Sequence, residues 1–501
     1  MTYLQAKPLR GINRVLSQSP ILHVSWPLII GVLSAIGVLV FSRYQTLGDP
    51  DTFLHLRIGQ WIIDHFTIPR VDLFSHSLVG EKWIAHEWLS GVILATIYRL
   101  GGWGGLVLLV AACLSITLAY LMGYLQKRVP PIYAIFFTGL TFFAVSTHLL
   151  ARPHILVWPL LVIWVGTLIT AQEQNRRPPF LLIGLMILWV NLHGSFIFGI
   201  AIILPIALEA IILSPAQLRR STIQNWLVFF VIASLACLIN PQGFAGAIFP
   251  LQILNLQHLG AIHEWMPYQF KGINPLEILL FTYFILALLG LLRLPIIRIV
   301  MVVGLVHMAL THNRYVSILG LVSPLLIARS FGQSYTEKFK NETASRLDPW
   351  FLGLTGQAST PAIVLSLLFI GTTALWTSHL GRYSPPQNIE AKAAIDAYQS
   401  LNHPGPGLND YRFGGALIYR DIPVFIDGRA DLYDKKVMGL YIEAMIDGKA
   451  SAIEKIIHEY QITWALLSPD SSAAAYFNTK TNWQRYYSDS NAVIYVFKAT
   501  K

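Results

Sequence analysis

Long apolar runs alternate with short polar segments along most of the chain, and they predict membrane-spanning helices. A hydrocarbon core of ~30 Å needs about 20 consecutive apolar residues in a helix. Eleven runs are long enough to cross this core or nearly cross it: residues 24–42, 104–126, 132–150, 154–171, 179–192, 196–213, 225–240, 276–292, 296–312, 315–329 and 361–379. Residues 88–100 are ambiguous, and we interpret them as a re-entrant or interfacial helix that turns at "GGWGG" (101–105).

Basic residues between the runs predict the orientation, because cytoplasmic loops carry an excess of Lys and Arg. If the N-terminus is cytoplasmic, every inner segment carries a basic cluster. The clusters are Lys7 with Arg10 and Arg14, Lys127–Arg128, Arg176–Arg177, Arg219–Arg220, Arg293 with Arg298, and Arg329 to Arg346. Counting 88–100 as a full crossing would move every later loop to the opposite side of the membrane and place the basic clusters outside. The distribution of basic residues therefore favours eleven crossings.

After residue 380 the pattern changes to that of a soluble α/β domain. The segments "PVFIDGR" (423–429), "ITWALLSPD" (462–470) and "AVIYVFK" (492–498) predict short strands, and "SAIEKIIHEY" (451–460) predicts an amphipathic helix. We therefore expect a cytoplasmic tail at 1–23, a transmembrane domain at 24–380 with an outer loop at 43–87, and an extracytoplasmic α/β domain at 381–501.

Composition and charge exclude several classes of function. Apolar residues make up 54% of the 501 residues and charged residues only 12%, too few to cover the surface of a soluble protein of this size. The net charge of +10 is spread over small clusters rather than one continuous face, so no nucleic-acid partner is expected. Without a P-loop, a GxGxxG before a helix or an HExxH, ATPase, dehydrogenase and zinc-protease functions have no support.

The first outer loop is unusually rich in ionisable residues and begins with "GDPDTFLHLRIG" (48–59). Asp51 is placed to cap a helix lying on the membrane surface, with an apolar face formed by Leu54, Ile58, Trp61 and Ile62. A helix cap and a solvated face would explain Asp49, Asp51 and His55 by themselves. They do not explain why the same loop also carries Asp72, His76, His86 and Glu87.

Other predicted outer loops carry residues that allow two interpretations. Arg152 and Arg314 could snorkel to lipid headgroups, or could bind phosphate through charge-assisted hydrogen bonds. Asn191 and His193 could satisfy a polar turn or contact a ligand, and Glu264 beside Trp265 could be an interfacial anchor or a substrate contact. His154 follows Arg152 in the same loop. Because rim charges are costly unless paired, their gathering on one side favours a functional site.

A metal site has weaker support. Asp49 and Asp51 offer the carboxylate oxygens that Mg²⁺ and Mn²⁺ prefer, but this spacing is common by chance. No metal ligand set is therefore predicted, and a divalent cofactor is left open.

The motifs resemble those of a known superfamily. The pattern "DPDTFLHLRIGQWI…IPRVDLFSHS…W..HEWL", followed by "ARP", "NLHG", "NPQG" and "FIDGRADLY", resembles a group of largely uncharacterised bacterial membrane proteins associated with the GT-C glycosyltransferases. The resemblance covers most of the chain. It implies a GT-C-like fold of about eleven transmembrane helices with an outer soluble domain, in the bacterial cytoplasmic membrane.

The resemblance also implies an activity: sugar transfer from a polyprenyl-phosphate donor to a glycan, lipid or protein acceptor, as in cell-envelope polysaccharide synthesis. The superfamily's essential carboxylate maps onto Asp51 or Asp49, and Asp51 is favoured because it heads the surface helix beside His55. Residues expected to contact the donor phosphate or substrate are His55, His86, Glu87, Arg152, His154, Asn191, His193, Glu264 and Arg314.

In the C-terminal domain, Asp410, Asp427 and Arg429 could contact the acceptor, with Tyr411 or Tyr433 stacking on sugar rings. The alternative is that these residues only shape turns. Two further functions stay open: a transporter or flippase of lipid-linked glycans, and a non-catalytic assembly subunit. A transporter predicts paired halves, and no such internal symmetry is seen. An assembly subunit would tolerate Asp49→Asn together with Asp51→Asn.

Overall fold

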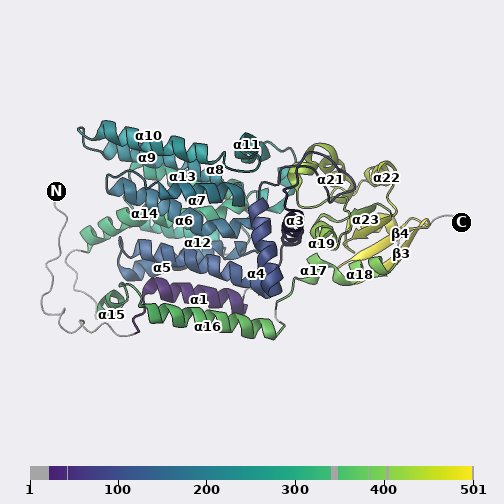
Figure 1. The fold of residues 1–501 in the computed structure, drawn as a ribbon, viewed down its shortest axis with the longest axis horizontal. Helices are drawn as coiled ribbons and strands as arrows, with labels where there is room; N and C mark the ends of the chain where they lie inside the picture. Colours follow the sequence, from purple (N-terminus) through teal and green to yellow (C-terminus); the bar gives the residue numbers. More distant parts are fainter. Residues whose placement is uncertain are drawn as a thin grey trace.

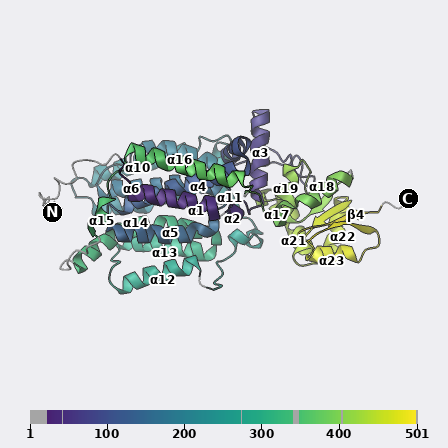
Figure 2. The same ribbon diagram turned by 90° about the horizontal axis from the view of Figure 1, so that it is seen from below.

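The computed structural model describes residues 22–41, 43–272, 274–339, 348–381, 383–401 and 405–498. A bundle of long helices forms one part of the molecule, and a small α/β domain is attached to one end of it (Figure 1). The first outer loop lies between the two parts, where α3 runs across the end of the bundle (Figure 2).

Each of the eleven apolar runs contains a helix. The bundle helices are α1 (Trp26–Phe41), α4 (Trp88–Leu125), α5 (Pro131–Val145), α6 (Pro153–Glu173), α7 (Leu181–Leu192), α8 (Phe196–Ala201) with α9 (Ile203–Leu213), α10 (Arg219–Ala236), α12 (Pro275–Leu288), α13 (Ile296–Thr311), α14 (Val316–Lys338) and α16 (Thr360–His379). Six helical stretches of the described chain are long and apolar enough to cross a membrane: 88–125, 131–148, 153–173, 196–213, 313–338 and 360–379. The count of eleven crossings stays a prediction.

The segment 88–100 turns where the sequence predicted. Helix α4 kinks at Gly102, whose φ of 57° and ψ of −149° are not helical. A positive φ is accessible to glycine at little steric cost. The part of α4 before Gly102 crosses the end of the bundle, and the part after it runs along the bundle (Figure 1).

Helix α3 (Asp51–His65) has the predicted apolar face. Leu54, Ile58 and Ile62 are buried, in a cluster that also contains residues of the C-terminal domain. Asp51, however, does not cap the helix. Pro50 occupies the N-cap position without a side-chain hydrogen bond, so the expectation of an Asp51 cap is wrong. The backbone N–H of Asp51 donates instead to Asp49 Oδ1 at 2.8 Å.

The C-terminal domain is built on a four-stranded sheet in the order β1-β2-β4-β3. The strands are β1 (Gly407–Asn409), β2 (Trp464–Leu467), β3 (Trp483–Ser488) and β4 (Val493–Phe497). Strands β1 and β2 are parallel, with Leu408 opposite Ala465, and the other pairs are antiparallel. The helices of this domain are α17 (Gln387–Glu390), α18 (Lys392–Leu401), α19 (Gly414–Tyr419), α20 (Ala430–Tyr433), α21 (Gly439–Met445), α22 (Ala450–Glu459) and α23 (Ser472–Asn478).

The strands predicted at 462–470 and 492–498 and the helix predicted at 451–460 are confirmed by β2, β4 and α22. The strand predicted at 423–429 is wrong. Only Val424 forms a bridge there, and its parallel partner is Ser75 of the first outer loop. Remaining short helices are α2 (Arg43–Thr46), α11 (Phe244–Ile253) and α15 (Asp348–Gly353).

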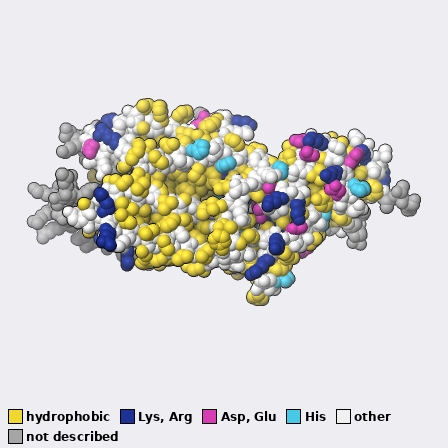
Figure 3. Space-filling view, turned by 90° about the horizontal axis from the view of Figure 1, so that it is seen from above, with side chains coloured by type: hydrophobic (Ala, Val, Ile, Leu, Met, Phe, Trp, Pro, Cys, Tyr) yellow, Lys and Arg dark blue, Asp and Glu magenta, His cyan; other side chains and the backbone are white. Residues whose placement is uncertain are grey.

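The two ends of the bundle differ in charge. Lys and Arg side chains gather at the end away from the C-terminal domain, and apolar side chains cover the bundle between the ends (Figure 3). The connections α4–α5, α6–α7 and α12–α13 carry Lys127–Arg128, Arg176–Arg177 and Arg293, and Arg219–Arg220 form the start of α10. Which end faces the cytoplasm stays a prediction, and the tail at 1–21 lies outside the described residues.

Arg298 differs from this group, although the sequence placed it in an inner loop. It lies within α13, is 5% exposed and bonds to Glu209 Oε2 at 2.7 Å and Gln172 Oε1 at 3.2 Å. An arginine buried among apolar helices needs such partners. It therefore holds α6, α9 and α13 together instead of facing solvent.

Candidate active site

Ionisable residues from distant loops meet at the end of the bundle that faces the C-terminal domain. They come from the first outer loop, the α5–α6 connection, the α7–α8 connection, the 3₁₀ turn His263–Trp265 and the turn Asn313–Tyr315 before α14. They form two groups, a carboxylate group around Arg152 and a histidine group around Glu87.

Arg152 is the centre of the first group. Its guanidinium pairs with Asp49 Oδ2 at 3.1 Å, with Asp51 Oδ2 at 2.8 Å and with Glu264 Oε1. Arg152 precedes α6 in an extended conformation (φ −125°, ψ 164°), and Pro153 begins the helix. Proline is well suited to the first helical position because it has no N–H to leave unpaired. The two early aspartates therefore face an arginine from a distant loop.

Asp51 has an unusual protonation equilibrium. Burial raises the pKa of its carboxyl group to about 7, with Arg152 opposing the shift and Asp49, Asp427 and Glu87 adding to it. Burial disfavours the charged form, and so do neighbouring negative charges. A carboxylate with a pKa near 7 is suited to accept and release a proton at neutral pH.

Glu87 is the centre of the second group. Its carboxylate lies 3.6 Å from His55 Nε2, 3.6 Å from His86 Nε2 and 3.4 Å from His193 Nε2. Burial opposes the charge of both Glu87 and His86, yet the electrostatic attraction between the two side chains prevails. It raises the pKa of His86 and holds the pKa of Glu87 well below its usual value.

His193 and His55 are neutral members of this group. Burial lowers the pKa of His193 to about 3 and that of His55 to about 4, in spite of Glu87. His193 Nδ1 accepts the backbone N–H of Ser195 at 3.0 Å, so the remaining ring proton sits on Nε2 and points to Glu87. The Ser195 hydroxyl accepts a hydrogen bond from Trp189 Nε1 at 3.0 Å. Ser195 thus fixes the tautomer of His193, a role that the sequence did not reveal.

Arg314 is a cation without a carboxylate partner among the described residues. Its Cζ lies 4.4 Å from the centroid of the Trp265 ring, which is a cation–π contact. The charges of Arg152 and Glu87 act on it electrostatically. This guanidinium can therefore donate hydrogen bonds to an incoming anion.

Two of the predicted substrate contacts already have protein partners. Asn191 accepts from Trp88 Nε1 at 2.9 Å and donates to the carbonyl oxygens of Ile187 and Ile239. His154 Nε2 donates to the His148 carbonyl oxygen at 2.8 Å. A substrate role for either residue stays a prediction.

The residues predicted to contact the acceptor are also engaged within the protein. Asp427 is fully buried and Arg429 is 4% exposed, and they pair with each other at 2.6 Å. Asp410 accepts from the Arg412 backbone N–H at 3.2 Å and from the Ser468 hydroxyl. Tyr433 donates to Asp427. Their acceptor role is untested, and the contacts shown are those of a folded domain.

An open groove runs beside the histidine group. It lies between the start of α4, helix α7 and the end of α10, with Leu89, Ile187, Leu188 and Ile239 among its lining residues. Trp88 and Asn191 also line it, and Trp88 follows Glu87 in the chain. An apolar groove of this kind can hold a hydrocarbon chain next to the ionisable residues.

The carboxylates and histidines of the described residues do not gather into a metal ligand set. In the part of the chain that the structure describes, no group of three or more His, Cys, Asp or Glu side chains could hold a metal ion. The carboxylates of Asp49 and Asp51 are instead bridged by the guanidinium of Arg152.

The fold is similar to that of solved membrane glycosyltransferases. Archaeal oligosaccharyltransferase AglB from Archaeoglobus fulgidus, in complex with an inhibitory peptide and a dolichol-phosphate, superposes with a TM-score of 0.54 at 12% identity, over 94% of this chain and 74% of that one. The oligosaccharyltransferase of the same organism tethered to an acceptor peptide gives 0.53 at 12%, over 88% and 68%. ArnT from Cupriavidus metallidurans in the apo state gives 0.50 at 13%, over 93% and 97%.

The chain therefore has the GT-C fold of these proteins, which is the fold that the resemblance noted from the sequence implies. With its long apolar helices, the chain is a multi-pass membrane protein. No protein-family model and no curated protein matches the chain.

Proposed function

We propose that the protein transfers a sugar from a polyprenyl-phosphate donor to an acceptor hydroxyl at the outer face of the cytoplasmic membrane. The observation that carries the proposal is the pairing of Asp51 and Asp49 with Arg152 at the end of a GT-C-fold bundle, where burial raises the Asp51 pKa to about 7. The similar AglB structure contains a dolichol-phosphate and the other oligosaccharyltransferase an acceptor peptide, consistent with a lipid-linked donor.

The proposed donor fits the arrangement of the site. Its lipid chain would lie in the groove lined by Leu89, Ile187, Leu188 and Ile239. Its phosphate would be bound by Arg314, which is held over Trp265 without a carboxylate partner among the described residues. Charge-assisted hydrogen bonds from an arginine suit a phosphate.

In the proposed reaction the acceptor hydroxyl oxygen attacks the anomeric carbon directly. As the new C–O bond forms, the bond between that carbon and the phosphate oxygen breaks. The hydroxyl proton passes to the Asp51 carboxylate, and polyprenyl phosphate leaves with the bonding electrons. Arg314 stabilises the negative charge that develops on the phosphate. Displacement without a covalent intermediate inverts the configuration at the anomeric carbon.

Arg152 would control when Asp51 acts. While it pairs with Asp49, Asp51 and Glu264, it favours the ionised form of Asp51, the form that accepts a proton. Glu264 comes from the α11–α12 connection, so a movement of that connection would change the number of carboxylates on Arg152.

The test is turnover of defined donors by purified protein in liposomes. A panel of polyprenyl-phosphate sugars would be supplied with candidate acceptors, and release of polyprenyl phosphate measured. We expect release that depends on an acceptor and is lost in Asp51→Asn. A glycosylated carboxylate trapped on the protein would refute direct displacement, and donor movement across the bilayer without release would favour a flippase.

A further inference from the structure

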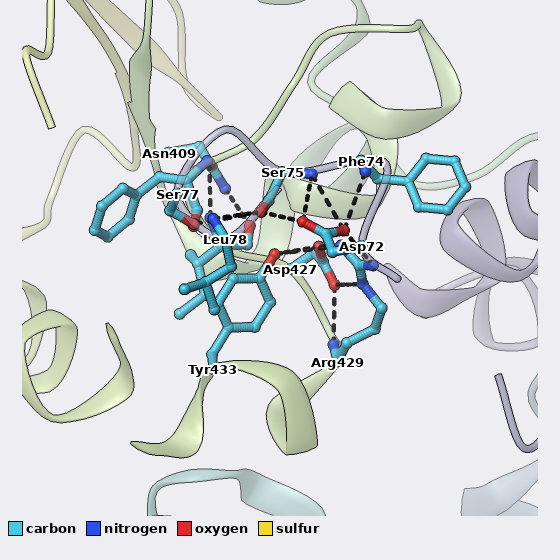
Figure 4. A network of polar contacts seen from close by, with 11 residues as sticks. Asp72, Phe74, Ser75, Ser77, Leu78, Asn409, Asp427, Arg429 and Tyr433 are labelled. Carbon is cyan, nitrogen blue, oxygen red and sulfur yellow. Dashed lines mark hydrogen bonds and ion pairs between the residues drawn. The ribbon is translucent and has the colours of Figure 1, made fainter. Parts of the chain in front are cut away.

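The first outer loop and the C-terminal domain are joined by a buried ionic network. Arg429 donates to both carboxylate oxygens of Asp427 at 2.8 and 2.6 Å and to Asp72 Oδ1 at 2.6 Å. The Tyr433 hydroxyl donates to Asp427 Oδ2 at 2.6 Å. Figure 4 shows the side chains of Asp72 and Asp427 converging on Arg429 from two parts of the chain.

Each charge in this network is fully buried or nearly so. Asp72 and Asp427 are 0% exposed, and Arg429 is 4% exposed. The Asp72 carboxylate also accepts hydrogen bonds from the backbone N–H groups of Phe74 and Ser75, at 3.0 and 3.2 Å, and from the Ser75 hydroxyl. A buried pair must have excellent geometry to offset the cost of removing its charges from water. Such geometry fixes the relative position of the two segments.

Backbone contacts continue the junction beyond the ion pairs. The His76 N–H donates to the Val424 carbonyl oxygen at 2.9 Å, and the Val424 N–H donates to the Phe74 carbonyl oxygen at 3.2 Å. Asn409 of β1 then donates to the Ile426 carbonyl oxygen at 2.8 Å and accepts the Phe425 N–H at 2.8 Å. Residues 424–426 are thereby held between the outer loop and the sheet.

The next residues of this segment reach the candidate active site. A Cβ atom added at Gly428 would lie 2.6 Å from Asp51 Cγ and would collide with Asp51 Oδ1. The Arg429 N–H donates to Asp427 Oδ1 at 3.0 Å across this glycine, so the turn is closed by the same carboxylate that binds the Arg429 side chain. A Cβ at Gly415 of α19 would likewise collide with the Pro50 carbonyl oxygen.

We propose that Asp72, Asp427 and Arg429 are positioning residues that hold Gly428 against the Asp51 carboxylate, so that the C-terminal domain forms one wall of the site. This rests on the transferase function proposed above. None of the three residues needs to touch the substrate. Their effect passes through the turn 427–429, which limits the positions open to Asp51 and keeps water from one side of its carboxylate.

Exclusion of water gives the network a measurable effect on Asp51. Burial is the largest cause of its raised pKa, and Gly428 contributes to that burial. The charged or titratable groups that act on Asp51 are Arg152, Asp49, Asp427, Glu87 and Tyr411. Loosening the turn admits water and moves the charge of Asp427 away, and both changes lower the pKa of Asp51.

The experiment compares two variants that disturb the contact between Gly428 and the Asp51 carboxylate in different ways. Arg429→Lys keeps the charge but loses the bidentate pairing with Asp427, while Gly428→Ala keeps the network and places a methyl group against Asp51. The controls are Lys480→Gln, which removes an exposed ion pair with Glu454 in the same domain, and Gly371→Ala, where an added Cβ meets nothing within 4 Å.

Two readouts are used on full-length protein in liposomes. The first is donor turnover against pH. The second needs no substrate: a hydrophobic carbodiimide labels protonated carboxyl groups, and peptide mass spectrometry reports the pH midpoint of labelling at Asp51. For Arg429→Lys we expect kcat to fall about tenfold or more, while donor KM stays within about threefold of the wild-type value. The acidic limb of the turnover–pH profile and the pH midpoint of Asp51 labelling should both move to lower pH. Gly428→Ala should lose kcat similarly.

The controls should keep the wild-type rate and labelling midpoint. The positioning role is refuted if Arg429→Lys keeps the wild-type labelling midpoint while folded, even if its rate is lower. It is also refuted if Gly428→Ala keeps the wild-type rate and midpoint. If wild-type protein turns over no donor, the transferase proposal fails, and the labelling midpoints of the variants still decide whether the network positions Asp51.

Discussion

Replacing Asp51 by Asn should abolish turnover and at the same time stabilise the protein at alkaline pH. The pKa of this carboxyl group is about 7 in the folded protein, against 3.8 for an aspartate exposed to water. The folded state therefore binds the proton more tightly than the unfolded state does. Above pH 7 the Asp51 carboxyl group is ionised although its buried position disfavours the charge. The uncharged amide of asparagine would remove this energetic cost.

The size of the effect follows from the shift. A difference of about 3 pKa units corresponds to roughly 4 kcal/mol at 1.36 kcal/mol per unit. For an acid whose folded-state pKa is raised, this cost is absent below about pH 4 and grows until the pH passes about 7. Asp51→Asn should thus be close to wild type in stability at pH 4 and more stable by up to ~4 kcal/mol at pH 8.

The assay is thermal unfolding of detergent-solubilised protein between pH 4 and pH 8.5, for wild type and Asp51→Asn. Asp64→Asn, at the exposed end of α3 where Asp64 pairs with Arg99, is the control and should change the melting temperature little. The reasoning predicts curves that diverge as the pH rises. A melting temperature of Asp51→Asn that is lower than wild type by the same amount at every pH would refute it.

Four further predictions follow from the same contacts. Turnover by the wild type should rise with pH around 7, because Asp51 must lose its proton to act as a base; a flat profile between pH 6 and pH 8 would contradict this. Arg152→Gln should leave three carboxylates unpaired and destabilise the protein by about 3–5 kcal/mol, measured by chemical denaturation in detergent. Arg314→Gln should raise donor KM about tenfold or more with little change in melting temperature, whereas a drop in stability alone would indicate a packing role. Gly184→Trp, which narrows the groove, should weaken use of long-chain donors more than short-chain analogues, and equal losses would exclude a lipid chain there.

Local periodicity was enough to predict much of the architecture. The apolar runs became helices because a helix satisfies its own backbone hydrogen bonds whatever surrounds it. The face formed by Leu54, Ile58 and Ile62 is buried as its spacing predicts, and the kink at Gly102 falls within the glycine-rich turn. Loop positions also indicated which residues share one end of the bundle, because antiparallel helices return the chain to the same side.

The spacing of residues along the chain could not predict which distant residues pair with each other. Asp51 was expected to cap α3, but its carboxylate forms an ion pair with Arg152, about a hundred residues later in the chain. Arg298 was expected in a basic loop and instead bonds to Glu209 inside the bundle. The "PVFIDGR" segment has the composition of a strand, yet its Val424 pairs with Ser75 of the outer loop.

The sequence alone determined which segments are helical, where the polar loops fall and which acidic and basic side chains those loops carry, since each of these depends on neighbours within a few turns. Only the tertiary structure decided the partners: Arg152 between Asp49 and Asp51, three histidines around Glu87, and Gly428 against Asp51. Charges of one sign have many possible partners of the other in a chain of this length. Packing of the helices and docking of the C-terminal domain select among them, because a buried charge is stable only where its partner is brought within hydrogen-bonding distance.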